Sequence, residues 1–144
     1  MKDTNNKLDY NLYSAGDYNN NTTGLNRNNE SIIVVSSEWS SIGENSFKIS
    51  RTSDVQPNTA YFIITNTGLS TITVEVDVYC PVNALEIQLY DGGNVLSQVT
   101  VPARTSVNNI VLSSQSDAAT LYVRFRFANP KDYAFLDNIS AITS

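Results

Sequence analysis

The chain has 144 residues, of which 41% are hydrophobic and 10% are aromatic, and its formal net charge is -5. This length suffices for one domain with a buried core, and without a run of about 18 apolar residues we expect no membrane insertion. The acidic balance argues against non-specific binding of nucleic acid, which depends on Lys and Arg contacts with phosphate. The sequence contains no His, which excludes Ser-His-Asp and Cys-His catalysis within the chain, and we expect no enzymatic activity.

Asparagine dominates the first 30 positions, with the densest cluster at residues 19–21. Biased polar composition of this kind is typical of linkers. We expect residues 1–10 to be a flexible N-terminal segment and residues 11–144 to form a single domain. No apolar stretch follows the charges of residues 1–7, so we expect no signal peptide there. The domain then belongs to a larger exported protein or, like a virion protein, needs no export signal.

Short alternating or apolar runs, separated by turn signals, fill the rest of the chain. A period of two is typical of half-buried strands, and no segment sustains a helical period over about ten residues. Residues 91–94, Asp-Gly-Gly-Asn, are typical of a hairpin turn. The expected strands are residues 32–35, 46–50, 60–65, 71–80, 85–90, 95–101, 109–112, 121–127 and 133–140. This spacing predicts an all-β sandwich or barrel.

The alternation also predicts which side chains are buried. In the strand over residues 71–80, Cys80 faces the same way as the Ile and Val residues, whereas Glu75, Asp77 and Tyr79 face the other way. Cys80 is the only cysteine, so it cannot form an internal disulfide, and we interpret it as a small core residue. The residues predicted to lie between the two sheets are Val74, Val76, Val78, Ile87, Val123, Phe125 and Phe127.

Asp137 interrupts the apolar pattern of the last strand. By simple alternation it shares a face with Phe135 and Ile139, where an apolar residue would fit better. A buried carboxylate without a partner is costly, so Asp137 needs a metal ion, an arginine or backbone N–H groups beside it. The sequence therefore predicts one polar anchor point near the C-terminal end of the sandwich.

Several motifs follow one another in a characteristic order. They are Asn11-Leu12 with Gly16-Asp17-Tyr18-Asn19, then residues 43–49, then residues 71–76, and finally Phe135-Leu136-Asp137-Asn138-Ile139-Ser140. Together they resemble the jelly-roll carbohydrate-binding modules that are appended to polysaccharide-degrading enzymes and surface proteins. The resemblance spans about residues 11–142 and implies a jelly-roll β-sandwich of two antiparallel sheets that binds glycans. Jelly rolls also serve as capsid modules, and a fold does not fix a function.

The resemblance also implies a structural calcium ion, which family members hold between an early acidic residue and the terminal aspartate. Asp137 matches that aspartate, whereas Asn19 stands at the early position and Asp17 precedes it by two residues. Calcium accepts amide and backbone carbonyl oxygens as well as carboxylates. The implied ligands are therefore Asp17, Asn19, Asn45 with nearby carbonyl groups, and Asp137. The loss of one carboxylate weakens the site, so the alternatives are a monovalent ion or no ion.

Glycans are recognised by flat aromatic rings that stack on sugar faces and by planar polar groups that hydrogen-bond the hydroxyls. The candidate residues are Trp39, Glu75, Asp77, Tyr79, Gln88, Tyr90, Tyr122 and Arg124. If their strands share one sheet, its open face is a binding surface. The alternative is a cross-strand charge ladder, in which the two acids pair with Arg124 and Arg126. Trp39 is either a stacking platform in an exposed loop or a buried plug at one end of the sandwich.

The most specific function that the sequence supports is non-catalytic binding of a polysaccharide or cell-surface glycan. The alternative is a structural or receptor-binding jelly-roll module of a phage or virus tail, or of a surface adhesin. The first function places the module outside the cell or on its surface, within a larger multidomain protein. The second places it on a virion and favours a homo-oligomer.

Overall fold

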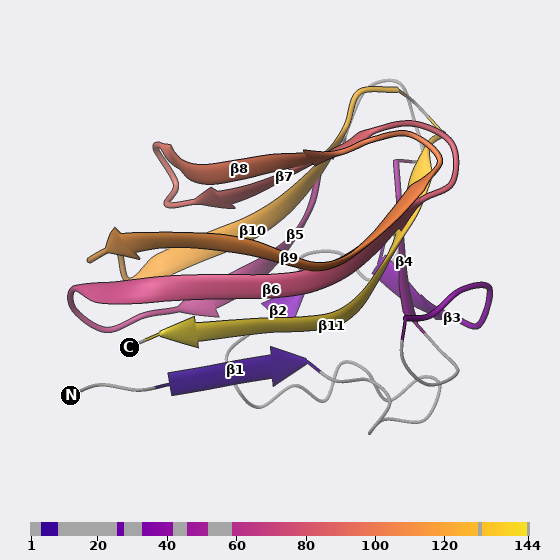
Figure 1. Ribbon diagram of the computed structural model, residues 1–144. Helices are drawn as coiled ribbons and strands as arrows, with labels where there is room; N and C mark the ends of the chain where they lie inside the picture. The colour runs from indigo at the N-terminus through magenta and orange to yellow at the C-terminus, as the bar shows by residue number, and fades with distance from the viewer. Residues whose placement is uncertain are drawn as a thin grey trace.

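The computed structural model describes residues 4–8, 26–27, 33–41, 46–51, 59–129 and 131–143. The described residues form no helix, and in particular none long and apolar enough to cross a membrane. The strands are β1 (Thr4–Leu8), β2 (Asn26–Arg27), β3 (Ile33–Ser36), β4 (Ser46–Ser50), β5 (Thr59–Thr65), β6 (Ser70–Cys80), β7 (Leu85–Tyr90), β8 (Val95–Val101), β9 (Thr105–Ser116), β10 (Thr120–Phe127) and β11 (Tyr133–Thr143). They pack as a sandwich of two antiparallel sheets, which confirms the predicted fold class (Figure 1).

The two sheets contain different numbers of strands. The six-stranded sheet has the order β3-β4-β11-β6-β9, with β1 also paired to β11, and the five-stranded sheet has the order β2-β5-β10-β7-β8. From β5 onward the chain passes from one sheet to the other several times, as the Greek-key connections of a jelly roll require. β11 is long enough to pair with β4 over residues 133–136 and with β1 over residues 139–143.

The core lies between the sheets and is built from the residues that alternation selects. All seven residues predicted to be buried are at most 3% exposed. Phe47 of the six-stranded sheet meets Phe62 of the five-stranded sheet edge to face, with ring centroids 5.9 Å apart, and Phe62 meets Phe125 in the same way at 6.3 Å. The first of these contacts joins the two sheets, and the second lies between neighbouring strands of the five-stranded sheet. Cys80 is fully buried as predicted, and burial, followed by the charge of Asp132, raises its thiol pKa to about 12.

The predicted charge ladder does not form. β6, which carries Glu75 and Asp77, lies in the six-stranded sheet between β11 and β9, whereas β10 lies in the five-stranded sheet. Alternation tells which residues share a face of one strand, but it does not tell which strand lies next to it. The actual partners of Arg124 and Arg126 are residues of β7 in their own sheet.

The prediction that Asp137 and Ile139 share a face is also wrong. The register of β11 against β6 shifts between Asp137 and Ser140, and Asn138 takes a positive φ of 51°. A bulge of this kind adds a residue to one strand and reverses the alternation beyond it. Ile139 therefore belongs to the core, while Asp137 lies opposite Asp77 on the outer face of the six-stranded sheet.

The N-terminal boundary of the domain stays a prediction. Thr4–Leu8, within the segment expected to be flexible, pairs with residues 139–143 of β11 as strand β1. Three of the four implied calcium ligands, Asp17, Asn19 and Asn45, lie outside the described residues.

Candidate functional site

Three tyrosines lie side by side on the outer face of the five-stranded sheet. Tyr61 of β5, Tyr122 of β10 and Tyr90 of β7 come from three neighbouring strands, and all three are half-buried. The ring centroids of Tyr61 and Tyr122 are 5.3 Å apart at nearly a right angle, and those of Tyr122 and Tyr90 are 6.2 Å apart. Their alternation with buried neighbours such as Phe62 and Val123 points the rings away from the core. The result is a row of aromatic rings across three neighbouring strands on the outer face of the five-stranded sheet.

A chain of hydrogen bonds crosses the same face one register step further along the strands. The Arg124 side chain donates through its Nε to Oε1 of Gln88, and the Gln88 amide donates to Gln98 at 2.8 Å and to Glu86 at 2.9 Å. The Arg124 guanidinium also lies over the Tyr90 ring, 3.7 Å from its centroid. This stacking is a cation–π contact. Gln88 is only 3% exposed, so the network holds Arg124 in one position against the tyrosines.

The next register step ends in a polar pocket. Arg126 lies opposite Glu86 and pairs with it at 3.3 Å, with both side chains well exposed. Beyond them a pocket of about 410 Å³ is lined by Arg51, Glu86, Arg126, Phe127 and Ala128. Arg51 donates to the Phe127 carbonyl at 3.2 Å, which directs its side chain to this end of β10. We call the whole surface, from Tyr61, Tyr122 and Tyr90 to this pocket, the tyrosine–arginine face.

The outer face of the six-stranded sheet carries a separate aromatic cluster. Tyr79 and Phe135, which are register partners, stack with centroids 6.0 Å apart, and Trp39 packs against both at 5.7 and 6.3 Å. Lys48 lies 4.7 Å from the ring centroid of Tyr133 and pairs with Glu38 at 3.0 Å. Trp39 is half-buried and therefore fits neither of the two alternatives fully.

Next to this cluster, two buried acids face each other across β6 and β11. Asp77 is 8% exposed and Asp137 is 0% exposed. Ser41 bridges them, because its N–H donates to Asp137 at 2.8 Å and its hydroxyl donates to Asp77 at 2.6 Å. Asn109 and Asn138, both at positive φ in bulges, donate their N–H groups to Asp77 and Asp137. Backbone N–H groups are thus among the partners that Asp137 was predicted to need.

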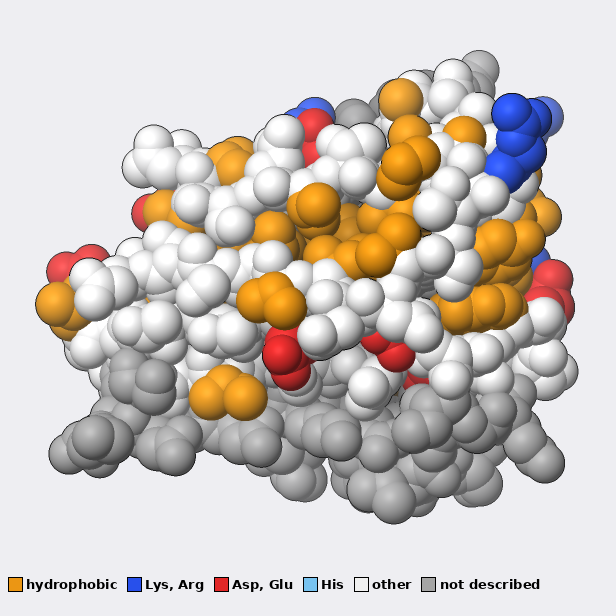
Figure 2. Space-filling view, in the orientation of Figure 1, with side chains coloured by type: hydrophobic (Ala, Val, Ile, Leu, Met, Phe, Trp, Pro, Cys, Tyr) orange, Lys and Arg blue, Asp and Glu red, His pale blue; other side chains and the backbone are white. Residues whose placement is uncertain are grey.

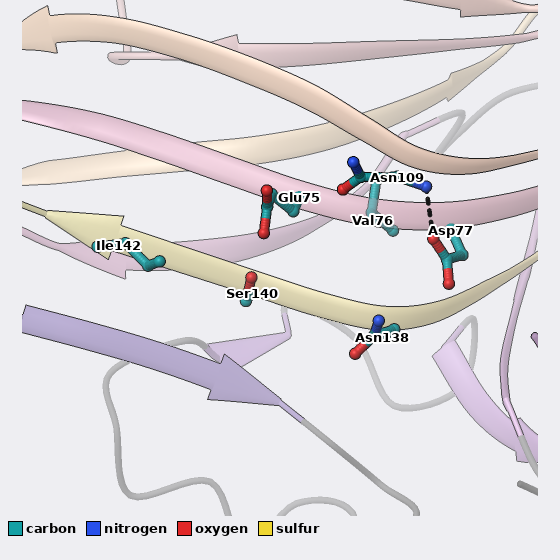
Figure 3. Close-up of a pocket in the computed structure, with 7 residues that line it drawn as sticks. All are labelled: Glu75, Val76, Asp77, Asn109, Asn138, Ser140 and Ile142. Carbon is teal, nitrogen blue, oxygen red and sulfur yellow. Dashed lines mark hydrogen bonds between the residues drawn. The ribbon is translucent and has the colours of Figure 1, made fainter. Parts of the chain in front are cut away.

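A shallow polar pocket of about 250 Å³ opens beside the acids. It is lined by Glu75, Val76, Asp77, Asn109, Asn138, Ser140 and Ile142 (Figure 3). Figure 2 looks onto this face and shows acidic side chains over β6 and β11. Among the described residues, no group of three or more Asp, Glu, Cys or His side chains is placed to hold a metal ion.

The predicted binding residues thus fall on two opposite faces. Gln88, Tyr90, Tyr122 and Arg124 belong to the tyrosine–arginine face, whereas Trp39, Glu75, Asp77 and Tyr79 lie over the six-stranded sheet. Asp77 is occupied by two protein hydrogen bonds and is nearly inaccessible. Tyr61 completes the tyrosine row but was not among the candidates, although its alternation between Ala60 and Phe62 marks it as outward-facing.

Comparison with known proteins supports the fold. No protein-family model and no curated protein matches the sequence. Among solved structures, a mutant of the carbohydrate-binding module CBM29-2 complexed with mannohexaose has a TM-score of 0.62 at 12% identity, covering 99% of this chain and 93% of that chain. The C-terminal CBM6 of LamC, a laminarinase from Zobellia galactanivorans, has a TM-score of 0.50 at 12% identity, covering 99% and 100%.

The module CBM6cm-2 from Cellvibrio mixtus lichenase 5A, in complex with cellotriose, has a TM-score of 0.50 at 12% identity, covering 82% of this chain and 91% of that chain. At such low identity the likeness shows the fold alone. The structural neighbours are carbohydrate-binding modules of several families, in agreement with the resemblance of the sequence motifs.

Proposed function

We propose that this chain is a non-catalytic glycan-binding module whose ligand lies across the tyrosine–arginine face. The observation that carries the proposal is the row of Tyr61, Tyr122 and Tyr90 beside the fixed Arg124–Gln88 pair. Aromatic rings offer apolar faces to sugar C–H groups, and a guanidinium with amides offers directed hydrogen bonds to hydroxyls. Because the network already holds these side chains, little ordering cost remains when a ligand binds.

The fold gives independent support. Structural neighbours include modules in complex with mannohexaose and cellotriose, and a jelly-roll sheet is a stable platform for an open binding face. The absence of His, with no other nucleophile and base pair recognised in the sequence, is consistent with binding without catalysis. A module of this kind meets polysaccharides outside the cell or on its surface, where we place the protein that contains it.

A broad glycan array first identifies polysaccharides that bind. Isothermal titration against these polysaccharides then tests the proposal. We expect Tyr122→Ala and Tyr61→Ala each to weaken binding roughly tenfold or more, because each removes apolar area of the size of one buried aromatic ring. The matched control is Tyr79→Ala, which removes the same side chain from the opposite sheet. If Tyr79→Ala or Trp39→Ala abolishes binding and the Tyr122 variant does not, the ligand lies on the six-stranded sheet instead.

If no glycan on the array binds, the proposed function is wrong. A stable dimer or trimer without sugar affinity would then support the structural or receptor-binding module. Thermal melts of every variant accompany the titrations, so that loss of binding is separated from loss of folding.

We further propose that calcium binds beside Asp137, as the motif resemblance implies. The buried carboxylate of Asp137 supplies hard oxygen atoms of the kind that calcium prefers, and a second carboxylate, Asp77, lies opposite it in register and is engaged by Ser41 and Asn109. The other implied ligands, near Asn19 and Asn45, would complete the set. A cation there would offset the repulsion between the two carboxylates and stabilise the folded chain.

Thermal denaturation tests the calcium proposal. Calcium that binds only the folded state raises the melting temperature by mass action. We expect the melting temperature to be higher in millimolar calcium than in chelator, and expect Asp137→Asn to remove most of this difference. Identical melting curves in calcium and chelator would contradict the proposal.

A further inference from the structure

Arg124 is a half-buried cation that has no anionic partner among the residues that the structure describes. Its hydrogen bond goes to the neutral amide of Gln88, and its guanidinium stacks on the Tyr90 ring. No carboxylate among the described residues forms a salt bridge with it. Half-buried charges are normally paired, because desolvation without a partner is costly. On a binding face, such a guanidinium is prepared for an anionic group supplied by the ligand.

The rest of the face has the same electrostatic character. Arg126 and Arg51 line the pocket at the end of β10, and Glu86, the one acid among the described residues of its lining, is shared between Arg126 and Gln88. An exposed ion pair such as Arg126–Glu86 contributes little energy and exchanges readily. Among the described residues, the tyrosine–arginine face therefore carries Arg124 and Arg126 beside one glutamate, with Arg51, which has further contacts, in the lining of its end pocket.

The outer side of the six-stranded sheet carries more acids than bases among the described residues. Over the six-stranded sheet lie Glu75, Asp77 and Asp137, and Figure 2 shows acidic side chains on that face. The whole chain has a net charge of -5, so the cluster of arginines is not a consequence of overall composition. A local excess of positive charge attracts anionic ligands and selects them over neutral ones.

We propose that the ligand of the tyrosine–arginine face is an anionic glycan, which carries uronate carboxylates or sulfate esters. The inference rests on the proposed function and deepens it by naming the class of glycan. Guanidinium groups bind carboxylate and sulfate-like oxygens through paired hydrogen bonds. Tyr122, Arg124 and Arg126 follow one another along one side of β10 at a spacing of about 6.6 Å. A polymer along this strand would stack on the tyrosines and present its anionic groups to the arginines.

The test uses matched pairs of glycans that differ only in charge. The pairs are β-1,4-mannan with β-1,4-mannuronan, methyl-esterified with de-esterified homogalacturonan, and mannan with chemically sulfated mannan. We expect the acidic member of at least one pair to bind at least tenfold more tightly at low salt, with the advantage shrinking as salt rises. The first and third pairs share the mannan backbone, so their comparison distinguishes carboxylate from sulfate as the preferred group.

Variants assign the effect to the face. Arg124→Gln is expected to remove most of the preference for the acidic member, whereas Glu86→Gln is expected to increase it. Lys48→Gln removes one positive charge from the opposite sheet and is expected to change neither affinity. Circular dichroism and melting curves confirm folding of each variant.

Equal affinity for the two members of every pair that binds, or preference for the neutral member in every such pair, would overturn the inference and leave the proposed function standing. A preference that Lys48→Gln lowers as much as Arg124→Gln would also overturn it, because overall charge would then be the cause. If no member of any pair and no glycan on the array binds, the proposed function itself fails, and the inference fails with it.

Discussion

Phe125 is one of the largest fully buried side chains of the core between the two sheets. It is fully buried in β10 and contacts Phe62 edge to face, and Phe62 in turn contacts Phe47 of the other sheet. Removing a ring from such a position loses its burial and leaves a cavity. We expect Phe125→Ala to lower the free energy of unfolding by about 3–5 kcal/mol, measured by urea denaturation. A loss below about 1 kcal/mol, as for an ordinary surface substitution, would contradict the register of β10.

Cys80 connects burial with the pH dependence of stability. Burial raises its thiol pKa from 9.0 to about 12, so between these values the unfolded chain releases a proton that the folded chain keeps. The contribution of the thiol to the free energy of unfolding is then fully present below pH 9. It falls as the pH rises above this value, by at most about 1.4 kcal/mol per pH unit. Cys80→Ala lacks this group, so we expect the stability advantage of the unchanged protein over this variant to shrink between pH 8 and pH 10.5.

Urea denaturation of both proteins in reducing buffer measures this difference, and subtraction cancels the titration of lysines and tyrosines. A difference that stays constant with pH would show that the thiol is not desolvated in the folded protein.

At the scale of the element, the turn of the β7–β8 hairpin depends on glycine at one position. Asp91 accepts hydrogen bonds from the N–H groups of Gly93 and Asn94 at 2.9 and 2.7 Å, and these bonds lower the pKa of its carboxyl group. Gly92 has a φ of +98°, whereas Gly93 does not have a positive φ. The turn therefore needs glycine at one of the two positions only.

We expect Gly92→Ala to lower the free energy of unfolding by about 1–2 kcal/mol, because L residues are strained at positive φ. A Cβ at this position would meet its nearest neighbouring atom, on Tyr122, at 4.0 Å, so crowding is not the cause. Gly93→Ala is the matched control and should change stability by less than about 0.5 kcal/mol. Equal losses for the two variants, measured by denaturation, would contradict this account of the turn.

The strands could be predicted from the sequence more reliably than the identity of the strands that pair with them. Alternation located β6, β7 and β10 and selected their buried residues correctly, because one face of each strand packs against the core. It could not show that β6 and β10 lie in different sheets, since pairing depends on long-range packing rather than on local pattern. The bulge at Asn138 was likewise not recognised, which placed Ile139 on the wrong face.

The dependence of pairing and burial on long-range packing also explains which residues of the candidate site could be predicted from the sequence. Tyr90, Tyr122, Arg124 and Gln88 were named because they alternate with apolar residues, and the structure brings these four together. Asp77 was selected by the same rule, but Ser41, which lies 36 residues away in the chain, covers and engages it. Burial by a distant loop leaves no local signal in the sequence.

At the scale of the whole molecule, β11 holds the six-stranded sheet together. It pairs with β6 along one edge, and with β4 and β1 along the other. β1 itself pairs only with β11. The first and last strands therefore contribute differently to the fold, although β1 and β11 lie side by side (Figure 1).

Two truncations test this difference together with the predicted domain boundary at residue 11. Removing residues 1–9 deletes β1, but residues 140–143 of β11 stay hydrogen-bonded to β6, so we expect cooperative unfolding to persist with a loss below about 2 kcal/mol, within the range of single substitutions. Removing residues 133–144 deletes a central strand and the core residues Leu136 and Ile139, so we expect no cooperative unfolding. Thermal melts followed by circular dichroism distinguish these outcomes. If the first truncation also abolishes the transition, β1 is an integral part of the domain and the boundary at residue 11 is wrong.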